Sequence, residues 1–201
     1  MTITETFRPY SSIPSFSRPS GTAPAVPPIH PPSLAPPHAG LLSGNVLHSI
    51  TIATAVGAGV VGGVLFAFST FVMPALRSLP DSQGMSAMQA INRFAPTALF
   101  MAVLFGTAIV AIVLGVSAVA HLDDTAAWWR LAGCVLYLAT IVITAAYHVP
   151  QNNALAAVSA TSAHAAGIWH RYASGWTALN SVRAATAIAA CICFAGPGRA
   201  L

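Results

Sequence analysis

Four long runs of apolar residues constrain this chain more than any other feature of its sequence. Each run has about 20 residues or more and almost no charge in its interior, and the runs cover roughly residues 46–73, 97–120, 130–149 and 176–195. A helix rises about 1.5 Å per residue, so each run is long enough to cross a hydrocarbon core about 30 Å thick. We therefore predict an all-α fold, a four-helix transmembrane bundle over residues 46–195.

Charged residues are too scarce for a chain whose main solvent is water. Only 6% of the residues are charged, compared with about a quarter in typical soluble domains. The 8 basic residues are all arginine and are scattered, so the net charge of +4 forms no basic patch of the kind that binds nucleic acid. The composition excludes a soluble globule and a nucleic-acid partner. It predicts a multi-pass protein of the cell membrane, with membrane lipid around it.

The two ends of the chain differ in composition from the apolar runs. Residues 1–45 contain ten of the 15 prolines together with many serines. Proline fixes φ and has no N–H to donate, so we predict a disordered Pro/Ser-rich tail without a catalytic role. Residues 196–201 are predicted to be a short C-terminal tail.

Prolines also suggest where the apolar helices end. Pro74 and Pro150 follow the first and third runs, and proline is a natural helix boundary. We therefore expect a loop over residues 74–96, with a short amphipathic helix inside it, and a second loop from Pro150 to about Ser174.

Small residues recur at every fourth position of the first run, at Ala55, Gly59, Gly63 and Ala67. Such a ridge allows another helix to approach closely. The approaching helix belongs either to the same bundle or to a second copy of the chain, so packing within the bundle and a homodimer are both open.

Arg183 is the most informative polar residue, because it lies inside the fourth apolar run. An arginine at the centre of a membrane helix costs about 2.5–3.5 kcal/mol on insertion scales, so it usually faces the bundle interior and finds a partner there. Among the four acidic residues of the chain, only Asp81 is expected on the same side of the membrane. Arg183 is therefore predicted to pair with Asp81, with amides and carbonyls, or with an anionic ligand.

Arg183 belongs to a set of polar and aromatic side chains that converge at one end of the bundle. Five of them share a helix face at i+3/i+4 spacing, namely Trp169, Tyr172, Trp176, Asn180 and Arg183. Two other segments contribute the amides of Gln89, Asn92, Asn152 and Asn153. Such convergence in an apolar bundle is typical of a binding site. The expected ligand is a lipophilic small molecule, either neutral or anionic. Packing of the aromatic face and helix capping by the asparagines are the alternatives.

His148 is the best candidate for proton transfer, since imidazole titrates near neutrality. A histidine that is merely hydrogen-bonded is the alternative. No metal is predicted, because His148, His164 and His170 match no ligand spacing and lack carboxylate support. The three cysteines lie in apolar runs, where buried packing is expected.

Four segments resemble, in the same order, the anthrone oxygenase-like family of small four-helix membrane proteins. The segments are Phe71–Arg77 (FVMPALR), Met88–Asn92 (MQAIN), Val149–Leu155 (VPQNNAL) and Trp176–Arg183 (WTALNSVR). The resemblance covers about residues 46–195. His148 departs from the family pattern, in which a small polar residue such as Asn precedes Val-Pro, and this changes either the proton-transfer group or a hydrogen bond.

The resemblance implies oxidation of an anthrone- or quinol-like aromatic substrate by O₂ without a bound cofactor. In that mechanism Arg183 stabilises the substrate oxyanion, with help from Asn180 and Asn153. His148 or Tyr172 takes the proton, and the aromatic stripe stacks on the flat substrate. The alternative is a non-enzymatic membrane module, such as a small-molecule binder, a transporter component or a partner subunit, because an anion-binding arginine suits transport as well.

Overall fold

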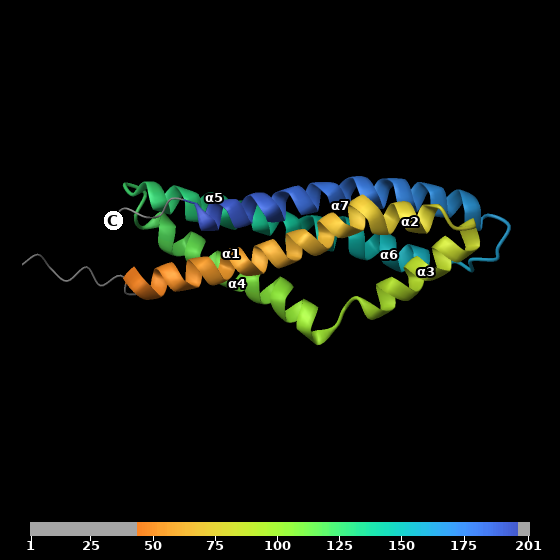
Figure 1. The fold of residues 1–201 in the computed structure, drawn as a ribbon, viewed down its shortest axis with the longest axis horizontal. Coiled ribbons are helices and arrows are strands. Elements are labelled where there is room, and N and C mark those ends of the chain that lie inside the picture. The colour runs from red at the N-terminus through yellow and green to blue at the C-terminus, as the bar shows by residue number, and fades with distance from the viewer. Residues whose placement is uncertain (1–43, 197–201) are drawn as a thin grey trace, which may run out of the picture. The chain divides into compact units, whose positions relative to one another are not determined.

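The computed structural model describes residues 44–196, and every regular element in that range is a helix (Figure 1). Four helical segments are long and apolar enough to cross a membrane, namely Gly44–Arg77, Ala98–Val119, Thr125–Ala156 and Ala165–Ala195. The predicted all-α fold with four transmembrane helices is thus confirmed. The predicted Pro-rich tail and C-terminal tail lie almost wholly outside the described residues.

The first and third spans each contain a π-helical turn. The first span consists of α1 (Gly44–Ala67), the π-turn η1 (Phe68–Val72) and α2 (Met73–Arg77). The third consists of α5 (Thr125–Ile143), the π-turn η2 (Thr144–His148) and α6 (Val149–Ala156). The second and fourth spans are α4 (Ala98–Val119) and α7 (Ala165–Ala195). The amphipathic α3 (Asp81–Phe94) lies between the first two spans, where a short helix was expected.

Pro74 and Pro150 do not end their helices, and the predicted boundaries there are wrong. Each proline follows a π-turn by two residues, and the helix then continues to Arg77 and to Ala156. A proline inside an α-helix leaves the carbonyl four residues earlier without a donor, and its ring collides with that carbonyl. The wider π-turn pairs each N–H with the carbonyl five residues earlier and gives the ring room, so the helix passes the proline.

The fourth helix is also longer than its apolar run. It begins at Ala165 rather than near residue 176, so the loop expected from Pro150 to about Ser174 shortens to residues 157–164. Its 31 residues span about 46 Å, which exceeds the hydrocarbon core. His170 and Arg171 interrupt the apolar run within this first part of α7, which is why hydropathy alone missed it.

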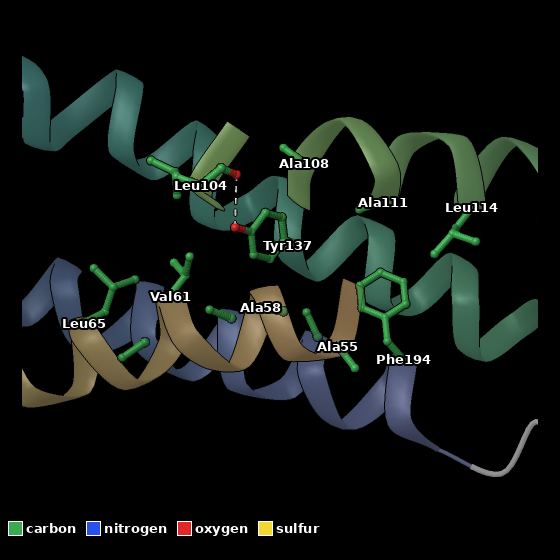
Figure 2. Packing of buried hydrophobic residues seen from close by; sticks show 13 residues of the cluster. Ala55, Ala58, Val61, Leu65, Leu104, Ala108, Ala111, Leu114, Tyr137 and Phe194 are labelled. Carbon is green, nitrogen blue, oxygen red and sulfur yellow. Dashed lines mark hydrogen bonds between the residues drawn. The ribbon is translucent and has the colours of Figure 1, made fainter. Parts of the chain in front are cut away.

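Helix α7 is the central element of the bundle. It packs against α1 and α5 along much of its length, while α4 packs mainly against α5 and less against α1 (Figure 1). Figure 2 shows small side chains of α1, such as Ala55 and Ala58, facing the core opposite α4. Tyr137 of α5 fills the space between them and donates its hydroxyl to the carbonyl of Leu104 at 3.1 Å.

The small-residue ridge of the first span lies partly inside the bundle. Ala55 is buried, and a Cβ added at Gly59 would lie 3.2 Å from the sulfur of Cys191 on α7. A Cβ at Gly63 would meet nothing within 4 Å. Part of the ridge therefore serves packing within this chain, and the homodimer stays a prediction.

A second hydrophobic cluster closes one end of the bundle. It is formed by α2, α3, α6 and the first half of α7, and this end is called the capped end below. Its fully buried side chains include Met73, Met85, Met88, Leu155 and Trp169. The cluster covers the region in which the predicted site residues gather.

Candidate functional site

The five side chains of the predicted stripe on α7 are all buried. These are Trp169, Tyr172, Trp176, Asn180 and Arg183. The stripe faces neighbouring helices rather than lipid, because the i+3/i+4 spacing holds along an uninterrupted α7. Trp169, Tyr172 and Trp176 lie in the cluster of the capped end. Asn180 and Arg183 follow them along α7, toward the middle of the bundle.

The two π-turns lie on either side of the middle of this stripe. In η1, the ring of Phe68 lies 5.8 Å from that of Trp176, and Ser69 contacts Asn180. In η2, the ring of His148 lies edge-on to Trp176 at 5.1 Å. Because π-turns break the regular backbone ladder, they are frequent at functional sites. Here both of them contact the same stretch of α7.

Asn180 is fully buried, and only the nitrogen of its side-chain amide has hydrogen-bond partners among the described residues. Its amide nitrogen donates to the carbonyl of Leu65 at 2.7 Å and to the hydroxyl of Ser69 at 2.9 Å, so both of its hydrogens are used. Its Oδ1 has no hydrogen-bond partner among the described residues. A buried amide oxygen normally accepts a hydrogen bond, so this atom is a free acceptor inside the bundle.

Arg183 lies one turn further along the same face and is 6% exposed. Its Nε is buried without a partner, and its guanidinium makes no hydrogen bond or ion pair with any residue in 44–196. The predicted pair with Asp81 does not form. Asp81 instead lies 3.2 Å from Nε2 of His170, which is about 20 Å along α7 from Arg183. Of the three partners predicted for Arg183, an anionic ligand is the one that the described residues leave open.

Asn180 Oδ1 and Arg183 Nε, which have no partner among residues 44–196, therefore belong to residues three positions apart on one buried face of α7. Leaving such a group unpaired costs about 1–3 kcal/mol, and more when it is charged. The two atoms thus offer a hydrogen-bond acceptor and a cationic donor that no described residue uses.

Asn152 and Asn92 hold the aromatic side chains in place instead of offering free groups. Oδ1 of Asn152 accepts from the Tyr172 hydroxyl at 2.8 Å and from Nε1 of Trp176 at 3.0 Å. The amide nitrogen of Asn92 donates to the Tyr172 hydroxyl at 3.2 Å. This network ties α3, α6 and α7 together and fixes the orientation of Trp176.

The other predicted residues are placed in three different ways. Gln89 donates to the carbonyls of Leu155 and Val158 at 2.8 and 2.9 Å, so it caps the end of α6. Trp169 stacks on Tyr172 with ring centroids 6.0 Å apart and belongs to the cluster of the capped end. Asn153 is exposed on α6 and lies outside the network of Asn152.

His148 is 2% exposed and directs both ring nitrogens at backbone carbonyls. Nδ1 lies 3.4 Å from the oxygen of Ile143, and Nε2 lies 3.3 Å from the oxygen of Trp176. A neutral imidazole has only one N–H, so in either tautomer one bare nitrogen faces a second acceptor. A proton on that nitrogen would turn the contact into a second hydrogen bond to the backbone.

Sequence reasoning missed the contribution of η1. Ser69 accepts from Asn180 and also lies 3.0 Å from the hydroxyl of Ser181. The one available signal was Pro74, since a proline inside an apolar helix requires an irregular turn just before it. Metal ligands are not clustered in the part of the chain that the structure describes, where no group of three or more His, Cys, Asp or Glu occurs.

Fold and site together define a four-helix integral membrane protein whose interior arginine has no partner among residues 44–196. The sequence model of the anthrone oxygenase family matches residues 85–193, from within α3 to near the end of α7, and this range includes Asn152, Asn180 and Arg183. The chain belongs to this family, as its four motifs indicated. No curated protein and no solved structure is similar enough to count as a match.

Proposed function

We propose that this protein oxidises an anthrone- or quinol-like aromatic substrate with O₂ inside the membrane. The observation that carries the proposal is the unpaired set of Asn180 Oδ1 and Arg183 Nε on the buried face of α7. Family membership supports the same reaction class. A lipophilic aromatic substrate also suits a site that is buried among membrane-spanning helices and includes Trp176.

The proposed reaction for an anthrone is balanced without any further reactant. Loss of a proton from the ring CH₂ group gives an enolate, whose electrons reduce O₂ as the new C–O bond forms. The peroxide anion that results regains the proton to become a hydroperoxide, and loss of water from this hydroperoxide leaves a second carbonyl. One anthrone and one O₂ thus give one anthraquinone and one water.

Each role follows from a contact of the residue concerned. Arg183 stabilises the enolate oxygen, because a fixed cation in a buried site acts strongly on a developing negative charge. Asn180 Oδ1 accepts from a hydroxyl of the substrate. His148 takes the proton from carbon, since protonation gives both of its ring nitrogens a hydrogen to donate. Tyr172 is already bound to Asn152, so its role is to position Trp176.

Oxygen uptake by the purified protein in detergent, with a panel of anthrones and quinols, tests the proposal. We expect uptake with equimolar quinone formation, and a loss of at least about 100-fold in Arg183→Met, the size of effect seen when one oxyanion donor is removed. Arg183→Lys should retain part of the activity, because it keeps the charge. Arg171→Ala, an exposed arginine on the same helix, is the matched control and should leave the rate unchanged.

The same experiment separates the alternative function from this one. Fluorescence quenching of Trp176 by the substrate panel reports binding independently of turnover. Arg183-dependent binding without oxygen uptake would identify a non-enzymatic small-molecule binder. Unchanged uptake in Arg183→Met would exclude the mechanism.

A further inference from the structure

A hollow of about 830 Å³ lies at the end of the bundle opposite the capped end. It is formed where α1 and α5 begin and where α7 ends. Its polar lining consists of His48, Thr51, Asp124, Thr125, Trp129 and Arg130, and apolar side chains of α1 and α7 line the rest. None of these residues belongs to the site described above.

Arg130 gives this hollow an unsatisfied cationic group. Its side chain is 14% exposed, and its Nε is buried without a partner in the described part of the chain. Its Nη2 lies 3.6 Å from Oδ2 of Asp124, whereas a charge-assisted hydrogen bond has a length of about 2.7–2.9 Å. The guanidinium therefore retains donors for an anionic group.

The hollow also carries negative charge, which disfavours a purely anionic ligand. Asp124 caps α5 through Oδ1, which accepts from the N–H of Ala126 at 2.9 Å, and its side chain is 54% exposed. The last carbonyls of α7 lie at the same end, where the helix dipole is negative. A ligand that matches both Arg130 and the negative part of the hollow must carry an anionic group and a cationic group close together.

The position of the hollow indicates where that ligand comes from. All three helix ends around it are ends of candidate membrane spans, and we therefore place the hollow near the boundary between hydrocarbon and water. Trp129 lines it and Trp128 is its exposed neighbour, and tryptophans concentrate at the level of the lipid headgroups.

We propose that this hollow binds the headgroup of an aminophospholipid, a phosphate ester with a primary ammonium. The phosphate is held by Arg130, with Thr51 and His48 beside it. The ammonium is held by Asp124 and by the terminal carbonyls of α7. A primary ammonium donates hydrogen bonds to these oxygens, whereas the methylated ammonium of a choline headgroup cannot.

Native mass spectrometry of the full chain, released from bilayers with equal amounts of ethanolamine, choline and glycerol phospholipids, tests this proposal. We expect the ethanolamine lipid to be retained about fivefold to tenfold over the other two. Arg130→Met should abolish retention of all three. Arg93→Met, an exposed arginine at the capped end, is the matched control and should change nothing.

Asp124→Asn provides a second variant that keeps the fold. Asparagine caps a helix as well as aspartate does, so α5 is preserved while the negative charge is removed. The ethanolamine preference should then disappear in favour of the anionic glycerol lipid. Oxygen uptake with the proposed substrates should stay unchanged in both hollow variants, which keeps this proposal separate from the proposed function.

Three results would overturn the inference. The first is equal retention of all three lipids by the unaltered protein, and the second is unchanged retention in Arg130→Met. The third comes from a photo-reactive amino acid at position 51, which should cross-link to lipid. Cross-links to residues 1–43 of the same chain would show that this segment occupies the hollow instead.

Discussion

The amide nitrogen of Asn180 donates to the hydroxyl of Ser69 at 2.9 Å and joins α7 to the π-turn of the first span. Together with the bond to the carbonyl of Leu65, this contact uses both amide hydrogens. The orientation of the amide is therefore fixed, and its oxygen stays unpaired. The π-turn thus determines which atom of Asn180 the site presents.

Substitution of Ser69 by alanine should reduce oxygen uptake more than it reduces stability. The hydrogen bonds from Asn180 and Ser181 to Ser69 are both lost, and each contributes about 0.5–1.5 kcal/mol to the free energy of unfolding. Uptake should fall about tenfold, which corresponds to about 1.4 kcal/mol of transition-state stabilisation, because the amide can then rotate. Ser86→Ala, an exposed serine on α3, is the control. Normal uptake in Ser69→Ala would show that the orientation of Asn180 has no catalytic role.

Asn152→Leu should destabilise the capped end, whereas Asn153→Leu should not. Removal of Asn152 Oδ1 leaves the Tyr172 hydroxyl and the indole N–H of Trp176 without their acceptor. Each buried donor left in this way costs about 1–3 kcal/mol. The neighbouring Asn153 is exposed, so the same substitution there should change the free energy of unfolding very little. Unfolding followed by tryptophan fluorescence measures both, and equal losses would mean that the network is not what stabilises this end.

Pro150→Ala tests whether the π-turn η2 positions His148. Alanine restores an N–H and removes the ring, so the third span can return to an α-helical register. Stability should then stay constant or rise, by up to about 3 kcal/mol. Oxygen uptake should fall, because His148 moves away from the carbonyl of Trp176. Pro80→Ala, which changes a proline just before α3, is the control. Full activity in Pro150→Ala would show that catalysis does not depend on the π-turn η2.

The sequence predicts helix faces well but does not predict which helices meet. The i+3/i+4 spacing from Trp169 to Arg183 correctly indicates one buried face, because that spacing depends on a single regular helix. The contact between Ser69 and Asn180 joins residues 111 positions apart and leaves no local signal. Proline rules failed at Pro74 and Pro150, since they describe α-helices and not the π-turns that accommodate a proline. The partner of Asp81 was missed because the part of α7 that holds His170 was taken for a loop.

Close contact between α1 and α7 depends on the missing side chain of Gly62. A Cβ at this position would lie 2.9 Å from Cγ1 of Ile188 and 3.2 Å from its backbone nitrogen, so α7 itself would have to move. Gly62→Ala should therefore cost about 1–3 kcal/mol, the usual range for overpacking. Gly63→Ala is the matched control, because a Cβ there meets nothing within 4 Å.

Unfolding in mixed detergent micelles measures both glycine variants. Gly63→Ala should be neutral or slightly stabilising, since alanine is the better helix former by about 1 kcal/mol. Because Asn180 of α7 bonds to Leu65 and Ser69 of the first span, Gly62→Ala should also lower oxygen uptake. A neutral Gly62→Ala would mean that the two helices are held apart by other contacts, and the position of the site would then not depend on this glycine.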